Sequence, residues 1–341
     1  MIDTYRSYPF WKTTPADVDD AIAHASHAEH SVLAKTPGGH SVHLLAYGAK
    51  PDYCRRANYS SACGAKDPRF YADREGKPAT ILLIGATHGQ ETEGVAALLN
   101  LISLIETGRD LRGEEVPSLM EAYRASGCRL LIIPVYNADG RARCIYDSMI
   151  GEPQEILRYY GTGTWKDGSL CGWPECKATH PILEAAGFLG AYYNDDGVNL
   201  MHDNFFAPMA EETRALLAMC DREAPECVIG LHGGSNSTNE LLQPAYASLS
   251  CREGVHRLAE AGAALAQSRG LRSHVRPVGG IEKDPPASFN LTSAIHHVCG
   301  AVSATYESNE GLLAPNAFTA EEILLEHYCL FESLFTLSWR A

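Results

Sequence analysis

The chain has 341 residues, of which 45% are hydrophobic and 21% charged, and its formal net charge is −14. A chain of this length and composition can bury a large core, which excludes a disordered protein. Acidic residues are spread along the whole chain, so a phosphate backbone or an anionic membrane surface would be repelled. We therefore expect neither nucleic acid nor a membrane as a partner.

The N-terminal residues, MIDTYRSYPFWKTTP, lack the basic and apolar regions of a secretion signal. No later segment has the roughly 18 apolar residues that a membrane-spanning helix needs. We expect a soluble, cytoplasmic protein whose eleven cysteines are mainly reduced thiols. One close pair, Cys171 and Cys176 with His180 nearby, could instead form a disulfide or an accessory zinc site. The sequence carries no signal for an oligomeric state.

Strands and helices alternate along the chain. Short apolar runs separated by helices are typical of a mainly parallel sheet that is covered on both faces. In chain order, the pattern predicts a helix over 15–30, strands over 41–47 and 80–87, a helix over 91–107, a strand over 128–136, a helix over 208–220, a strand over 226–231, a helix over 252–268, a strand over 300–306 and a helix over 319–336.

No internal repeat or domain boundary is visible, so we expect one catalytic domain over residues 1–341, with residues 1–40 as a helical lead-in. Residues 49–78 are rich in polar residues, glycine and proline, which predicts an inserted loop. Residues 147–196 are also irregular and carry several tyrosines and tryptophans. Loops of this length are often functional, and we expect this one to cover one end of the sheet.

Polar residues follow four of the predicted strands. His88, Asn137, His232 and Glu307 each lie just past the carboxyl end of a strand. In sheets of this kind, ligands bind in the crevice beyond the carboxyl ends of the strands. These four side chains, although far apart in sequence, should therefore meet at one edge of the sheet.

The segment His88-Gly-Gln-Glu91 places an imidazole and a carboxylate at the mouth of a helix, where both can bind one divalent metal ion. His232 is the expected third ligand, and it precedes Gly233-Gly234, whose lack of side chains permits close approach. Two histidines and one glutamate leave an open coordination position, as in catalytic zinc sites. The pattern predicts one catalytic zinc ion held by His88, Glu91 and His232.

Glu307 supplies what such a metal site lacks, a general base that takes the proton of the attacking water. Glu310 is a competing candidate, but it lies past Ser308-Asn309 in the predicted turn. We therefore expect Glu307 to be the base.

Each of these residues also has a simpler interpretation when it is taken singly. A histidine after a strand is often a hydrogen-bonded loop residue, and His-x-x-Glu occurs often by chance. Asn137 and Asp139 fit an ordinary turn, because Asn, Asp and Gly all favour turns. The joint occurrence of the residues, in order and at strand ends, favours the metal site.

The ordered motifs resemble those of the zinc metallocarboxypeptidase family over roughly residues 40–335. This resemblance implies a three-layer α/β/α domain with a mixed, mostly parallel, twisted sheet of about eight strands. It also implies one catalytic zinc ion, with His88, Glu91 and His232 as ligands and Glu307 as general base. The motifs that carry it are His88-Gly-Gln-Glu91, Asn137-Ala-Asp-Gly140, Gly197-Val-Asn-Leu200, His232 and Thr305-Tyr-Glu307.

The segment after Gly197 departs from the family pattern. Where the family has Asp-Leu-Asn-Arg, this chain has Asn199-Leu-Met-His202. The arginine of that motif grips the carboxylate of the substrate, and an imidazole does not replace its bidentate fork. We expect Asn199 and His202 to line a rebuilt substrate-binding region.

Asn199 also stands where an aspartate would orient the first zinc histidine. Such a loss typically costs about 10-fold to 100-fold in metal affinity or activity, unless Asp139, Asp195 or Asp196 compensates. Ala138 replaces a proline of the family, which is a mild change. Phe289 stands nearest to the family's phenolic tyrosine and can pack against a substrate but cannot donate a hydrogen bond.

Arg141 and Arg143 directly follow Asn137-Ala-Asp-Gly140. A guanidinium near the zinc would polarise the scissile carbonyl and stabilise the oxyanion. Because the family places its arginine further downstream, Arg158 is a third candidate. At least one of the three is expected to be a solvated surface arginine.

The sequence thus predicts a zinc-dependent hydrolase of amide bonds, with a peptidase of the metallocarboxypeptidase kind as the first hypothesis. The altered carboxylate-binding segment supports a second one, a deacylase or amidase that acts on an acylated amino acid or a small modified peptide. A non-catalytic, metal-free binding protein on the same scaffold is the third. The presence of every predicted ligand and of the base argues against it.

Overall fold

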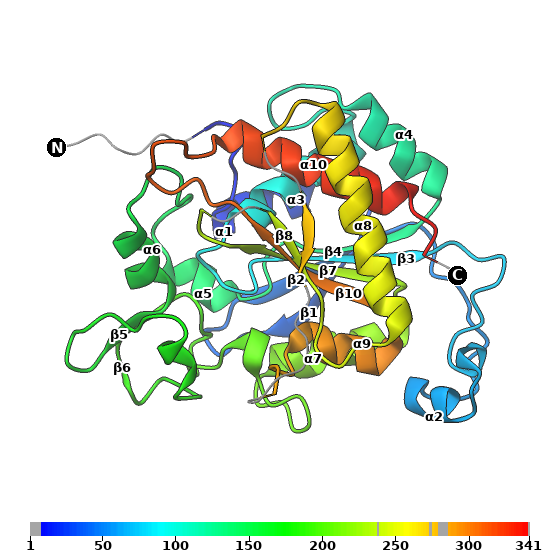
Figure 1. The fold of residues 1–341 in the computed structure, drawn as a ribbon, viewed down its shortest axis with the longest axis horizontal. Helices are drawn as coiled ribbons and strands as arrows, with labels where there is room; N and C mark the ends of the chain where they lie inside the picture. The colour runs from blue at the N-terminus through cyan, green and yellow to red at the C-terminus, as the bar shows by residue number, and fades with distance from the viewer. Residues whose placement is uncertain (1–7, 237–238, 273–274, 279–285, 340–341) are drawn as a thin grey trace.

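Eight strands form one mixed sheet in the computed structural model, which describes residues 8–236, 239–272, 275–278 and 286–339 (Figure 1). The order across the sheet is β1-β2-β4-β3-β7-β10-β8-β9. Their bounds are β1 Glu29–Lys35, β2 Ser41–Tyr47, β3 Thr80–Gly85, β4 Arg129–Ile133, β7 Cys227–Gly233, β8 Glu240–Leu242, β9 Arg276–Val278 and β10 Val302–Ser308.

The centre of the sheet is parallel and fully buried. β4, β3, β7 and β10 pair in parallel, β1, β2 and β4 pair antiparallel at one edge, and β8 is antiparallel to β10. Burial on both faces explains why β3 and β4 are continuously apolar rather than alternating. The mixed, mostly parallel α/β/α sheet implied by the family resemblance is confirmed.

Helices cover both faces of this sheet (Figure 1). Alternate side chains of β3 enter the two apolar layers, with Ile81 and Leu83 on one side and Leu82 and Ile84 on the other. The first layer contains α1 Pro15–His24, α3 Glu93–Thr107, α4 Pro117–Ser126, α8 Leu249–Ser268 and α10 Ala320–Thr336. The second contains α2 Tyr59–Gly64, α7 Glu211–Glu223 and α9 Leu291–Cys299.

The N-terminal helix is shorter than predicted. It begins with a capping box of Thr14 and Asp17 and ends at His24, so the predicted helix over residues 25–30 is wrong. Glu29–Lys35 instead forms the edge strand β1, whose side chains are mostly exposed. Backbone pairing with β2 holds this strand in place, so its residues need not alternate between apolar and polar. The sequence therefore lacks the pattern that would predict a strand here.

The other predicted strands and helices exist, with ends that differ by up to three residues. Several short elements were not predicted, namely α4, α9, β8 and β9. β8 and β9 have only three residues each, too few for a periodic pattern.

The two insertions contain local structure of their own. Residues 49–78 include α2 and a 3-10 turn at Pro68–Phe70. Residues 147–196 include α6 Gln154–Gly161, the two-stranded sheet of β5 Gly163–Trp165 and β6 Ala186–Leu189, and a 3-10 turn at Glu175–Lys177. This second insertion lies at one end of the molecule (Figure 1, green). No helix in the described ranges is long and apolar enough to cross a membrane.

Candidate metal centre and its cavity

Three buried side chains from two separate parts of the chain converge at the carboxyl ends of β3 and β7. His88 and Glu91 lie in the turn between β3 and α3, and His232 lies near the end of β7. One potential ligand atom from each of the three lies within 4.8 Å of the others. The structure thus assembles the three predicted metal-ligating residues.

Both imidazoles present their Nδ1 atom to the same carboxylate. His88 Nδ1 lies 2.7 Å from Glu91 Oε1, and His232 Nδ1 lies 2.8 Å from Glu91 Oε2. Burial disfavours the charge of Glu91, but the two histidines lower its pKa to about 2. An ionised carboxylate between two imidazole nitrogens is a donor set that fits a zinc ion, with His88, Glu91 and His232 holding it.

Glycines make this convergence possible. A Cβ on Gly89 would lie 2.1 Å from the carbonyl carbon of Gly140, and a Cβ on Gly94 would lie 2.5 Å from Leu231 Cβ. The Gly89 N–H donates to the carbonyl of Ala191 at 2.8 Å, which ties the His88 turn to the 147–196 insertion. Close packing of the chain around Gly89 therefore fixes the turn that carries His88.

The triad opens into a cavity of about 550 Å³, a volume that suits a small ligand. The insertion supplies one wall with Gln154, Leu157, Arg158, Gly161, Thr162, Trp173, Lys177 and Tyr192. The remaining lining residues are His88, Gln90, Glu91, Met201, His202, His232, Gly233, Gly234, Ser235, Leu242, Ser288, Asn290, Glu307 and Glu310.

Both candidate bases line this cavity. Glu307 pairs in register with His232 across β10 and β7. Burial, reinforced by the charge of Glu91, raises the pKa of Glu307 to about 7, so this carboxyl can exchange a proton near neutral pH. Glu310 accepts a hydrogen bond from Ser235 N at 2.7 Å, and burial together with nearby carboxylates raises its pKa well above the usual value. A carboxyl that stays protonated is less suited to act as a base.

His202 lines the cavity, as expected from the sequence, and Ser288 Oγ lies 3.1 Å from its Nδ1. Burial and the charge of Lys177 lower the pKa of His202 to about 3, so its imidazole is neutral. A neutral imidazole supplies no positive charge in place of the arginine that the family pattern would put there.

The structure places Arg141 and Arg143 away from the lining of the cavity. Arg141 is fully buried and donates to the carbonyls of Gly89, Cys144 and Tyr146. Arg143 donates to the carbonyl of Gly190 at 2.8 Å and pairs with Asp195. Neither arginine lines this cavity, so the catalytic role expected of the two stays a prediction that the lining does not support.

Arg158, the third arginine candidate, does line the cavity. It belongs to α6, and its side chain is exposed to solvent. No ion pair or side-chain hydrogen bond engages its guanidinium within the described part of the chain. Of the three predicted arginines, Arg158 is the one available to a substrate.

Asn199 and Phe289, two predicted substrate-binding residues, lie outside the cavity lining. Asn199 is buried and its Oδ1 accepts a hydrogen bond from Met201 N at 3.0 Å. Phe289 packs on the ring of Phe206 at 5.6 Å between centroids. Its neighbours Ser288 and Asn290 line the cavity instead.

The groups expected to compensate for Asn199 also bond elsewhere. Asp139 accepts hydrogen bonds from Thr36, Gly38 and Asp195. Asp195 pairs with Arg143, and Asp196 is exposed. Neither Asp139 nor Asp195 contacts His88 through these bonds, so they do not orient its imidazole.

All eleven cysteines lie in the described ranges and are free thiols. Cys171 and Cys176 are buried in one small apolar cluster, while His180 Nε2 accepts a hydrogen bond from Asn199 N. Neither the disulfide nor the accessory zinc site considered for this pair is formed.

Comparison with solved structures shows which known fold this chain has. A metallocarboxypeptidase from Burkholderia cenocepacia superposes with a TM-score of 0.61 at 13% identity, over 94% of this chain and 68% of the other. A metallocarboxypeptidase from Pseudomonas aeruginosa gives 0.54 at 12% identity, over 94% and 68%. Bovine thrombin-activatable fibrinolysis inhibitor, solved with a tick carboxypeptidase inhibitor, gives 0.54 at 11% identity, over 96% and 97%.

The chain has the metallocarboxypeptidase fold. No protein-family model and no curated protein matches the sequence, so the likeness rests on structure. On this metallocarboxypeptidase fold, the triad of His88, Glu91 and His232 forms a His-x-x-Glu and distant-His metal site.

Among the lining residues that sequence reasoning missed are Lys177 and Tyr192. Both come from the irregular insertion, where no periodic pattern or motif indicates which way a side chain points. The many aromatic residues of the insertion indicated that the segment is functional. They did not indicate which of its side chains line the cavity.

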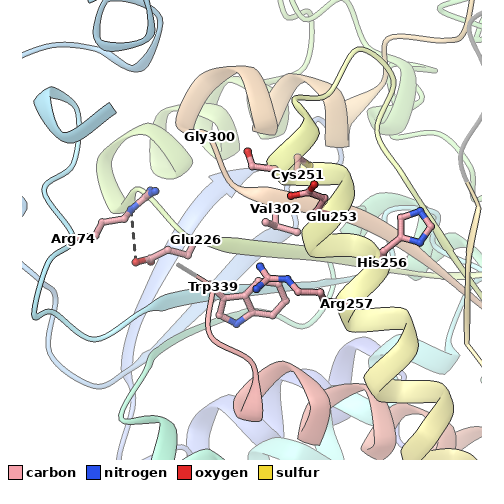
Figure 2. A pocket seen from close by; sticks show the side chains of 10 residues that line it. Arg74, Glu226, Cys251, Glu253, His256, Arg257, Gly300, Val302 and Trp339 are labelled. Atoms are coloured by element: carbon pink, nitrogen blue, oxygen red, sulfur yellow. Dashed lines mark ion pairs between the residues drawn. The ribbon is translucent and has the colours of Figure 1, made fainter. Parts of the chain in front are cut away.

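A second cavity of about 460 Å³ lies at the amino ends of β7 and β10, at the opposite end of these strands from the metal triad (Figure 2). Arg74 Nε lies 3.7 Å from Glu226 Oε1 there, and the guanidinium also donates to the carbonyl of Ala224. Arg74 and Glu226 thus form an ion pair in the lining of this cavity.

Proposed function

We propose that this protein is a zinc-dependent hydrolase of amide bonds, a metallocarboxypeptidase-like enzyme whose first candidate substrates are peptides. One observation carries the proposal: a buried His-Glu-His triad and the carboxyl of Glu307, the register partner of His232, line the same cavity. A scaffold that had kept only a binding role would have no need for this combination.

Different residues of the chain have different roles in the proposed reaction. His88, Glu91 and His232 hold the metal, and Glu307 takes the proton of the attacking water and returns it to the leaving amine. A zinc ion, when bound, supplies Lewis acidity toward the scissile carbonyl and lowers the pKa of water at its open position. The register pairing of Glu307 with His232 supports this division, because it fixes the base beside a ligand.

Lys177 and Arg158 support a substrate that carries an anionic group. Both cations line the cavity of a chain whose net charge is −14. The charge of Lys177 acts on Glu307, His88 and His202, so Lys177 lies within electrostatic reach of the triad and the base. We propose that Lys177, with Arg158 further out, pairs with a carboxylate close to the scissile amide.

A deacylase or amidase acting on an acylated amino acid or a small modified peptide is the alternative. The replacement of the carboxylate-binding arginine by neutral His202 favours it, as does the wall that the insertion adds to the cavity. An acylated amino acid also has a carboxylate that can pair with Lys177. The substrates of the peptidase and of the deacylase therefore differ in the acyl group of the scissile amide.

A substrate panel tests the proposal. It contains short peptides with free and amidated C-termini and a set of N-acylated amino acids, each assayed with zinc and with a chelator. Hydrolysis of free-ended peptides supports the peptidase, and hydrolysis confined to N-acylated amino acids supports the deacylase. Equal cleavage of free and amidated ends contradicts the carboxypeptidase, and no zinc-dependent cleavage contradicts the enzyme.

The role of Lys177 is tested with matched variants. Lys177→Met should reduce kcat/KM for free-ended substrates by about tenfold or more, the loss expected for one charge-assisted hydrogen bond, and Lys177→Arg should retain most of it. Lys166→Met is the control, because Lys166 is exposed in the same insertion and does not line the cavity. An equal loss for free and amidated substrates would instead assign Lys177 to the scissile carbonyl.

A further inference from the structure

The ring of Tyr192 lies flat against the imidazole of His88. The ring centroids are 3.6 Å apart and the planes differ by 5°. His232 meets the same imidazole edge-on, with centroids 4.9 Å apart at 77°. The plane of His88 is thus defined by one stacked ring and one perpendicular ring.

Apart from the contact of Nδ1 with Glu91, no hydrogen bond of the His88 ring defines this plane in the described part of the chain. A metal-binding histidine usually donates its second ring N–H to a carboxylate or a carbonyl, which fixes the ring. His88 Nε2 is buried and has no hydrogen-bond partner among the described residues. Asn199, which the sequence places at the orienting position, accepts from Met201 N instead.

The backbone holds the two stacked rings in register. The Gly89 N–H, next to His88, donates to the carbonyl of Ala191, next to Tyr192, at 2.8 Å. Asn137 Nδ2 donates to the same carbonyl at 3.1 Å. Tyr192 N in turn donates to Gly161 O at 3.0 Å. These bonds prevent the insertion from sliding past the His88 turn, and so keep the stack in place.

Tyr192 acts through the face of its ring. A neutral ring in face-to-face contact restricts rotation of the imidazole without adding charge to the site.

We propose that Tyr192 is a positioning residue of the metal site, whose stacked ring aims His88 Nδ1 at the metal position in place of a hydrogen bond to Nε2. This inference rests on the proposed function, because it requires that the triad binds a metal. It assigns a role to the 147–196 insertion, which links the wall of the cavity to the geometry of the triad.

Zinc affinity without substrate tests the inference. Zinc is titrated into metal-free protein against a competing chelator, and the visible spectrum of the cobalt-substituted protein reports the coordination geometry. Tyr192→Leu should bind zinc about 10-fold to 100-fold more weakly and alter the cobalt spectrum, the range expected when a metal ligand loses its orienting partner. Tyr192→Phe keeps the ring and should stay within about threefold of the wild type.

Tyr159→Leu is the matched control. Tyr159 belongs to the same insertion and stacks on Phe188, with centroids 4.7 Å apart at 9°, but it does not line the cavity. Removing this stack should leave zinc affinity and the cobalt spectrum unchanged. The control separates the stack on His88 from general packing of the insertion.

Two results overturn the inference while the proposed function stands. One is wild-type zinc affinity in Tyr192→Leu. The other is a loss of zinc affinity in Tyr192→Phe, which would assign the effect to the hydroxyl group. The phenylalanine variant also keeps the test decisive if the leucine variant does not fold. If the wild-type protein binds no zinc, the proposed function itself fails, and the two failures are therefore distinguishable.

Discussion

Glu307 and His232 are direct register partners on the parallel strands β10 and β7. Neighbouring strands lie about 4.8 Å apart, so the sheet itself, and not a loop, sets the separation of base and metal ligand. His232 and the His88 turn meet in the same way, because β3 is the other parallel neighbour of β7. The proposed catalytic arrangement thus depends on the buried centre of the sheet.

The rigid spacing makes the length of the Glu307 side chain critical. Glu307→Asp withdraws the carboxylate by one methylene, and a displacement of this size costs about 100-fold in rate. We expect kcat to fall by that factor with zinc content unchanged, as measured by steady-state kinetics and metal analysis. Glu307→Gln should abolish turnover and still bind zinc, and a loss of zinc would instead identify Glu307 as a ligand.

The pH dependence follows from the ionisation of Glu307. Burial raises its pKa to about 7 without a metal, and the added charge of a bound zinc ion lowers that value. The base must be deprotonated, so kcat/KM should fall as pH decreases, with a midpoint below about 7. A profile that stays flat from pH 8 to pH 5, or rises toward acid, would exclude Glu307 as the base.

Substitution of Arg141 should affect mainly stability, and substitution of Arg158 should affect mainly activity. Arg141→Met leaves three buried carbonyls without their donor, and we expect the free energy of unfolding to fall by at least about 2 kcal/mol. Arg158→Met removes an exposed side chain, so its unfolding free energy should stay within about 0.5 kcal/mol of the wild type.

The effects of the two substitutions on activity should be the reverse of their effects on stability. Arg158→Met should lower kcat/KM for a carboxylate-bearing substrate by about tenfold, whereas the folded fraction of Arg141→Met should keep its kcat. Urea unfolding and kinetics on the same preparations decide the matter. Loss of kcat in fully folded Arg141→Met would restore Arg141 to the catalytic group.

The turn that carries His88 has no room for a side chain at Gly89. A Cβ there would lie 2.1 Å from a backbone carbon of Gly140, which cannot move aside as a side chain would. We expect Gly89→Ala to displace His88 and weaken zinc binding by more than about tenfold. Calorimetric titration with zinc measures this, and Gly64→Ala, at a site with open space and no positive φ, controls for the added methyl group alone.

The sequence predicted the parts of the site that the sheet positions. His88 follows the apolar strand β3, and His232 and Glu307 lie near the carboxyl ends of the buried strands β7 and β10, so the meeting of these residues at one edge followed from strand ends alone. The eight-stranded architecture came from the family resemblance, because β8 and β9 are too short to recognise. The edge strand β1 was missed for a related reason, since its pairing involves the backbone.

Sequence patterns could not predict which residues form the wall of the cavity. Lys177 and Tyr192 line the cavity, and the bond from Gly89 to Ala191 joins their insertion to the His88 turn. Arg141 lies outside the lining and donates to backbone carbonyls that only the folded chain brings together. Side-chain direction in irregular segments is a tertiary property.

Zinc titration of metal-free protein, with amide hydrolysis followed in the same samples, tests the central claim most directly. We predict that each chain binds one zinc ion, that hydrolysis rises in proportion to bound zinc up to one equivalent, and that His232→Ala abolishes both. A protein that binds no zinc, or that hydrolyses amides equally well without it, would contradict the proposed function.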